Sequence, residues 1–255
     1  LVTSPVELTM SGLPKLEQIR STSQSGLSVV TLVFAEGTDI YSARALVNQR
    51  ILSAQALLPK GYSPELGPLA TALGEILQFE VRGDGYTPLQ LRTILDWDIA
   101  PQLRGVHGVT EINSHGGYAK SFEVRLNPDR LASLGLSLEE VFDALEKNNL
   151  TAGGGSISHA GERRLIRGEA LLKNSSDISQ VVVRSQPGSP PLLVRDLGEV
   201  EVAPMARQGA VTRDGRGEAV TGLVLMLLGE NSRNVVAAVK ARLAEIAPTL
   251  PPGIR

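Results

Sequence analysis

A stretch that occurs twice in the chain constrains its fold more than any other feature. Residues Gly37–Gly61 and Gly229–Gly253 superpose without a gap, so that Val47 meets Val239. In both copies apolar residues recur at helical spacing, polar residues precede them, and a proline followed two residues later by a glycine ends them. This pattern predicts a capped amphipathic helix in each copy.

A second, shorter echo lies upstream of each of these helices. Residues Gly12–Ser21 and Gly105–Ser114 share glycine, branched apolar residues, isoleucine and serine in register. The first repeated unit therefore runs in one piece over Gly12–Gly61, whereas the second runs over Gly105–Gly253 and must contain an insertion. Repetition alone thus predicts an α+β protein of two similar units, the second of which is split by an inserted domain.

Strand-like runs and turn signals place the boundaries of these parts. We expect residues 1–85 to form the first unit, completed by a strand over Gly74–Val81 and lacking one strand upstream. Residues 86–117 and 207–255 should form the second unit. Gly116-Gly117 marks the entry to the insertion, residues 118–206. Residues 219–227 form a near-continuous apolar run, which predicts a strand buried on both faces.

Composition excludes several classes of function. The net charge is −2 without a basic tract, which argues against nucleic acid as a partner. Cysteine is absent, and no apolar run approaches the roughly 20 residues that a membrane-spanning helix needs. Because the chain opens at Leu1 in the middle of a pattern and without methionine, we expect an excised soluble piece. The sequence contains no catalytic constellation, so we expect no enzyme and no cofactor.

A few polar residues stand out from their surroundings. Glu75 interrupts an apolar strand face, and His115 shares a strand face with Glu111. Each glutamate is either a strand-end residue that reaches water or a carboxylate kept for a cation. His115 is a weaker candidate, because it is also typical of an exposed loop residue.

Residues 153–168 have a glycine-rich base and no apolar periodicity, which favours a projecting hairpin arm. No Gly-Lys-Ser/Thr follows the glycines, so they are not a phosphate loop. We expect this docking arm to reach a neighbouring protomer through the following residues: Gly153, Gly154, Gly155, Arg163, Arg164 and Arg167.

Short stretches spread along the whole chain resemble one known family. They are, in order, Ser4-Pro5-Val6-Glu7, Phe34-Ala35-Glu36-Gly37-Thr38-Asp39, Glu65-Leu66-Gly67-Pro68, Ala72-Leu73-Gly74-Glu75-Ile76, Asp96-Trp97, Gly108-Val109-Thr110-Glu111-Ile112, Gly116-Gly117 and Leu193-Val194-Arg195-Asp196. The ordered set resembles the first large periplasmic loop of resistance–nodulation–division efflux pumps, and most closely their heavy-metal branch of the cobalt–zinc–cadmium type.

The resemblance implies two porter subdomains of ferredoxin-like β-α-β type, with a docking subdomain inserted in the second. It also implies the periplasmic part of a bacterial inner-membrane proton antiporter. Such a pump is a trimer that works with a periplasmic adaptor protein and an outer-membrane channel. In zinc-type members acidic residues of this loop guide or hold the metal, and the matching positions here are Glu75 and Glu111.

Three functions remain open from the sequence. The first is export of divalent cations (zinc, cobalt, cadmium or nickel), with the ion as transported substrate. The second is the multidrug branch of the same family, which needs an aromatic-lined cleft although only four Phe, four Tyr and one Trp are available. The third is a purely structural docking module that never touches the substrate. Carboxylate and imidazole ligands suit zinc, cobalt or nickel, so they favour the first.

Overall fold

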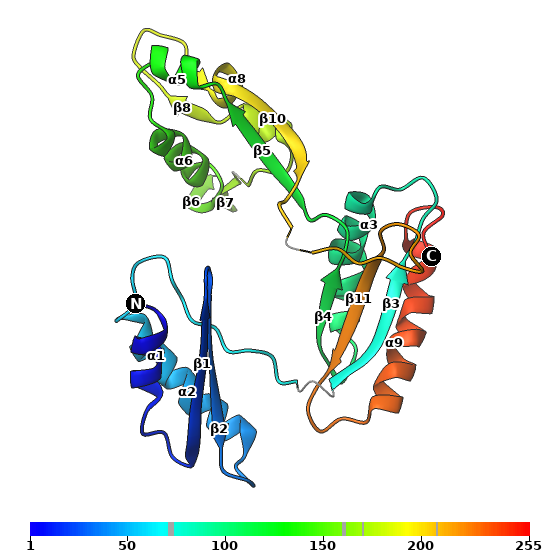
Figure 1. Ribbon diagram of the computed structural model, residues 1–255. Coiled ribbons are helices and arrows are strands. Elements are labelled where there is room, and N and C mark those ends of the chain that lie inside the picture. The colour runs from blue at the N-terminus through cyan, green and yellow to red at the C-terminus, as the bar shows by residue number, and fades with distance from the viewer. Residues whose placement is uncertain (71–73, 160–161, 170, 208) are drawn as a thin grey trace. The chain divides into compact units, whose positions relative to one another are not determined.

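The computed structural model describes residues 1–70, 74–159, 162–169, 171–207 and 209–255. It is an α+β protein with several small antiparallel sheets, divided into two compact units, Leu1–Leu69 and Ala70–Arg255 (Figure 1). Within the described residues, no helix is both long and apolar enough to cross a membrane.

The first unit is a two-stranded hairpin packed against two helices. Its elements are α1 (Thr3–Met10), β1 (Leu16–Gln24), β2 (Leu27–Phe34) and α2 (Ile40–Gln55). Strands β1 and β2 pair antiparallel, and Gly26 takes a positive φ of 77° in the turn between them. The Asp39 side chain caps α2 by accepting a hydrogen bond from the backbone N–H of Ser42. The first copy of the repeated helix is therefore confirmed.

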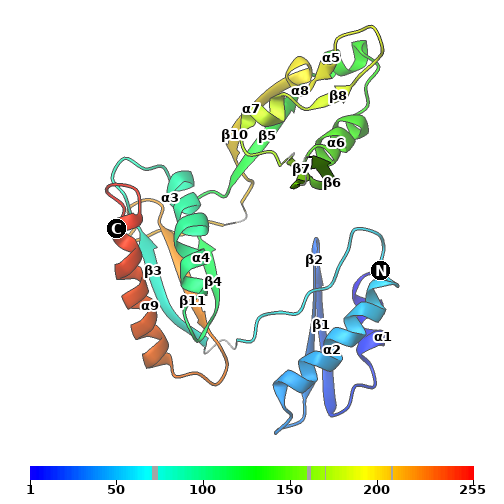
Figure 2. The same ribbon diagram turned by 180° about the vertical axis from the view of Figure 1, so that it is seen from behind.

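The second unit contains a three-stranded antiparallel sheet in the order β3-β11-β4. Its strands are β3 (Glu75–Val81), β11 (Val220–Met226) and β4 (Val109–His115). Helices α3 (Pro88–Ile94), α4 (Ala100–Arg104) and α9 (Ser232–Ile246), with the π-helix η2 (Leu95–Ile99) between α3 and α4, join it in one core. Figures 1 and 2 show these helices on one side of the sheet and the other face free of helices.

The pairing of β3 corrects the expectation that this strand completes the first unit. Along its whole length β3 pairs with β11, and its residues Leu77, Phe79 and Val81 pack into the core beneath α3, α4 and α9. The physical reason lies in β11, of which the consecutive residues Val220 and Thr221, with side chains on opposite faces, are both buried. A strand so enclosed needs a hydrogen-bonding partner at each edge, and β3 and β4 supply them.

The insertion forms a module of its own between β4 and β11. Its strands β5 (Lys120–Leu126) and β10 (Gly198–Pro204) pair antiparallel. Around them lie α5 (Pro128–Ser133), α6 (Leu138–Lys147), α7 (Ser175–Ser179), α8 (Val194–Leu197) and the short strands β8 (Val182–Arg184) and β9 (Leu192–Leu193). Strands β6 (Thr151–His159) and β7 (Glu162–Glu169) pair as a hairpin where the sequence predicts an arm.

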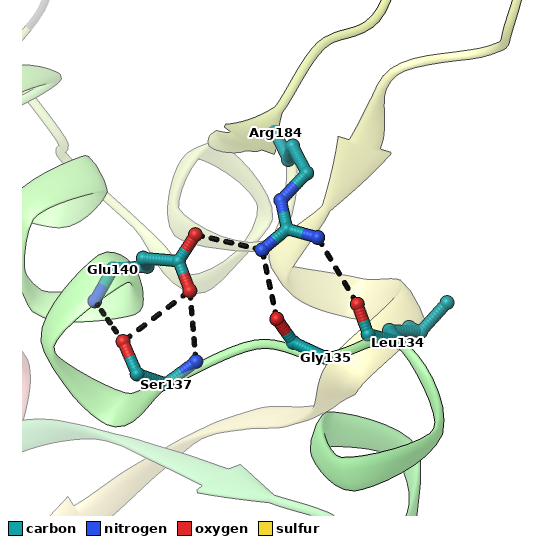
Figure 3. A network of polar contacts seen from close by, with 5 residues as sticks. All are labelled: Leu134, Gly135, Ser137, Glu140 and Arg184. Carbon is teal, nitrogen blue, oxygen red and sulfur yellow. Dashed lines mark hydrogen bonds and ion pairs between the residues drawn. The ribbon is translucent and has the colours of Figure 1, made fainter.

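A polar network around Arg184 joins β8 to the start of α6 (Figure 3). The guanidinium donates hydrogen bonds to the backbone carbonyls of Leu134 and Gly135, both at 3.0 Å, and pairs with Glu140 at 2.7 Å. The Ser137 and Glu140 side chains also form a reciprocal capping box at the helix start. Backbone hydrogen bonding from Ser137 and then the bond from Arg184 lower the pKa of the Glu140 carboxyl.

We expect Arg184→Ala to lower the stability of the inserted module by about 1–2 kcal/mol at neutral pH, because two backbone carbonyls lose their charged donor. The lowered pKa of Glu140 means that its contribution is complete above its ordinary value of 4.5 and is lost as the pH falls through the folded-state pKa. Glu140→Gln should therefore reduce the acid sensitivity of unfolding.

Thermal unfolding of the chain between about pH 7 and pH 3 measures both effects. The matched control is Arg195→Ala, because Arg195 is exposed and its side chain has no hydrogen bond to the residues that the structure describes. Equal melting temperatures for Arg184→Ala and Arg195→Ala would show that the network does not stabilise the module.

Candidate functional site

The two candidate glutamates flank the same residue of the central strand. In the register of the three-stranded sheet, Leu225 of β11 lies opposite Glu75 of β3 on one side and opposite Glu111 of β4 on the other. The sequence analysis assigns Glu75 to the first unit and Glu111 to the second, and the strand pairing corrects this assignment. Because β3 belongs to the sheet of the second unit, a single sheet presents both residues.

The geometry leaves both carboxylates accessible. With neighbouring strands about 4.8 Å apart, the Cα atoms of Glu75 and Glu111 lie about 10 Å from each other. Glu75 is exposed and Glu111 is half-buried. Within the described part of the chain, neither side chain takes part in a hydrogen bond or an ion pair. Each carboxylate is therefore free to accept a cation.

The carboxylate of Glu80, towards the other end of β3, differs in this respect. Its Oε2 atom lies 2.6 Å from Arg82 and 3.2 Å from Arg213. Two guanidinium groups neutralise one carboxylate, so Glu80 is a structural partner rather than a cation ligand. No local pattern separates Glu80 from Glu75, because Arg213 comes close to Glu80 only in the tertiary fold.

His115 lies at the opposite end of β4 from the glutamate pair. It faces Thr221 in the register, whereas Glu111 faces Leu225. Four residues along a strand span about 13 Å, and strand side chains stand roughly perpendicular to the sheet. His115 also lines a pocket of about 360 Å³ together with Arg92 and Arg207. It therefore does not join Glu111 in one compact site.

The arginines at this pocket hold the junction between the sheet and the insertion. Arg92 pairs with Asp96 at 2.8 Å and donates to the carbonyl of Gly116 at 2.9 Å. Glu218 accepts the backbone N–H of Gly117 at 3.0 Å and pairs with Arg207. In the sequence only the glycine pair Gly116-Gly117 indicates this junction. The charged residues that hold it together are distant from the glycines in the chain.

No group of three or more His, Cys, Asp or Glu side chains suited to hold a metal ion occurs among the described residues. Two carboxylates supply fewer than the three or four ligands of ordinary zinc sites. Glu75 and Glu111 therefore do not complete a closed metal site by themselves.

The predicted arm residues lie on the hairpin of β6 and β7. Gly153, Gly154 and Gly155 belong to β6, and the three arginines belong to β7. The Arg163 side chain donates to Ser156 at 2.9 Å across the hairpin. The side chains of Arg164 and Arg167 lie outside the described part of the structure. Arg163 thus stabilises the hairpin itself.

Known proteins are similar to this chain along its whole length. The model of the AcrB/AcrD/AcrF family matches residues 1–255. "Cation efflux system protein CzcA" of Alcaligenes sp. (strain CT14) is 47% identical over 263 residues, covering 100% of this chain and 25% of the relative. "Cobalt-zinc-cadmium resistance protein CzcA" of Cupriavidus metallidurans is 47% identical over 262 residues, covering 99% of this chain and 24% of the relative.

A solved structure is similar as well. A crystal structure of a heavy metal efflux pump (crystal form II) superposes with a TM-score of 0.87 at 30% sequence identity, covering 100% of this chain and 25% of that chain. The chain therefore spans about a quarter of the length of the relatives that it matches.

Proposed function

The chain belongs to the AcrB/AcrD/AcrF family of transporters, and on that premise we propose that it is the periplasmic portion of a proton-driven inner-membrane pump that exports divalent heavy-metal cations. The observation that carries the proposal is the 47% identity, along essentially the whole chain, to a protein named for cobalt, zinc and cadmium resistance. The family consists of transporters, so the chain is part of a transporter rather than an enzyme.

We infer that the chain comprises two ferredoxin-like porter subdomains, the second split by a docking subdomain. The internal repeat supports this division, since it matches β1 with β4, β2 with β11 and α2 with α9. The pairing of β3 moves the boundary of the first subdomain from residue 85 to about residue 69. Residues 118–206 remain the docking subdomain.

In this proposal the metal ion is the transported substrate and passes the carboxylates of Glu75 and Glu111. Oxygen ligands suit zinc, cobalt and nickel, whereas thioethers suit copper(I). The chain has only three methionines, Met10, Met205 and Met226, which lie far apart in the sequence. The further ligands come from segments of the full-length pump outside this chain.

The proposed partners follow from the family. The full-length pump is a trimer that works with a periplasmic adaptor protein and an outer-membrane channel. The hairpin of β6 and β7 reaches a neighbouring protomer in that trimer. Support for this role comes from the glycine-rich base of the hairpin and from the three arginines of β7.

Export of cations and export of drugs predict opposite growth phenotypes. The full-length gene is expressed, with its adaptor and channel, in a bacterium that lacks its own metal and drug exporters. We expect higher tolerance to zinc, cobalt or cadmium and unchanged tolerance to lipophilic drugs. Tolerance to drugs without tolerance to metals would reject the proposal in favour of the multidrug branch.

A further inference from the structure

Trp97, the exposed tryptophan of the second unit, lies in a π-helical turn that is caused by a proline four residues later in the sequence. In a regular α-helix the N–H of residue 101 would bond to the Trp97 carbonyl, but Pro101 has no N–H and its ring clashes with that carbonyl. The chain responds with the π-helix η2, in which the Ala100 N–H reaches the Leu95 carbonyl. Trp97 is 76% exposed on this turn. Such π-turns are frequent at functional sites.

An open pocket of about 560 Å³ lies beside this turn. Its lining residues are Trp97, Asp98, Gln102, Thr249, Leu250, Pro251 and Pro252. The Gln102 amide donates to the Asp98 carbonyl at 3.0 Å and accepts from Arg242 at 2.9 Å. The Tyr86 hydroxyl, outside the pocket, donates to the carbonyl of the lining residue Pro252 at 2.9 Å. The lining residues Gln102 and Pro252 are therefore held in place before any ligand arrives.

Charge determines what the pocket can accept. Asp96 on the same turn is neutralised by Arg92 at 2.8 Å. Asp98 lines the pocket, and its carboxylate has no hydrogen bond or ion pair within the described residues. One uncompensated negative charge thus lies beside the exposed ring of Trp97. Tryptophan is also the best aromatic partner for a cation.

We propose that this pocket receives an arginine side chain presented by a partner protein. A planar guanidinium can stack on the Trp97 ring while it donates two hydrogen bonds to the Asp98 carboxylate. Its aliphatic stem can pack against Pro251 and Pro252. Lysine offers a compact and strongly hydrated charge without this planar geometry, so it fits less well. The inference is independent of the transported substrate.

The chain provides its own reporter for the test, because Trp97 is its only tryptophan. The blocked tripeptide acetyl-Gly-Arg-Gly-amide is titrated into the 255-residue chain while tryptophan fluorescence is recorded. We expect a saturable change with a dissociation constant on the order of millimolar. Matched titrations use the same tripeptide with lysine, or with citrulline, which is a neutral analogue of arginine.

Asp98→Asn should weaken binding of the arginine tripeptide about fivefold or more. Asp129→Asn is the matched control, since it removes an equally exposed charge from α5 and should leave the dissociation constant unchanged. Unchanged circular dichroism melting verifies that both variants fold. The absence of saturation, equal binding of the lysine or citrulline tripeptide, or unaltered binding by Asp98→Asn would each overturn the assignment of an arginine pocket.

Discussion

Glu111→Ala in the full-length pump is expected to lower zinc tolerance by roughly tenfold, the scale on which loss of a supporting group weakens a metal site. Glu75 on β3 and Glu111 on β4 lie on either side of Leu225 on the central strand β11. Neither carboxylate has a hydrogen bond or an ion pair among the described residues. Removal of either carboxylate takes one attractive charge away from the path of the ion. Glu75→Ala should therefore act in the same direction, and the double variant should approach a strain without the pump.

The measurement is the minimal inhibitory concentration of zinc at matched protein level in the membrane. Glu199→Ala is the control, because it removes a strand carboxylate from β10 of the inserted module instead. If both single variants keep full zinc tolerance, Glu75 and Glu111 are ordinary strand-end residues. That result would leave metal export by the pump intact and would reject only the role of these two carboxylates.

Gly116→Ala is expected to destabilise the second unit by about 3 kcal/mol or more, the range of severe single substitutions. A Cβ atom at this position would lie 2.0 Å from the carbonyl oxygen of Ala219 and 3.1 Å from the Val211 Cβ. The positive φ of 72° adds strain for any L-residue. No rotamer relieves a clash with backbone, so the strand ends that lead into the insertion must separate.

Urea unfolding followed by Trp97 fluorescence reports the stability of the sheet next to Gly116, and far-UV circular dichroism of the same samples follows the inserted module, which contains no tryptophan. Substitutions at two other glycines separate the effect of the backbone clash from the effect of a positive φ. Gly135 has a φ of 58° with nothing within 4 Å of a Cβ, so Gly135→Ala should cost only about 1 kcal/mol. Gly198 is extended, but its Cβ would lie 2.0 Å from the Arg125 carbonyl oxygen, so Gly198→Ala tests the clash alone. A Gly116→Ala loss no larger than that of Gly135→Ala would refute the clash.

The local elements and the internal repeat follow from the order of residues alone. Helices α2 and α9 begin after Asp39 and Asn231, whose side chains accept hydrogen bonds from the first turn, as the pattern predicts. The run that became β11 is apolar except for Thr221 and is buried on both faces. These features depend on neighbours in the chain, on helical or strand periodicity and on side chains that cap their own helix, so a reader of the sequence can find them.

Which strands share a sheet depends instead on the pairing of segments that are distant in the chain. The strand over Gly74–Val81 is equally suited to either unit by its residues, and hydrogen bonding to β11 assigned it to the second. The same pairing placed Glu75 and Glu111 beside Leu225, whereas His115 came to lie near Arg92 and Arg207. Partners such as Glu80 with Arg213 are 133 residues apart. Contacts of this kind depend on the packing of distant segments, and local periodicity carries no information about them.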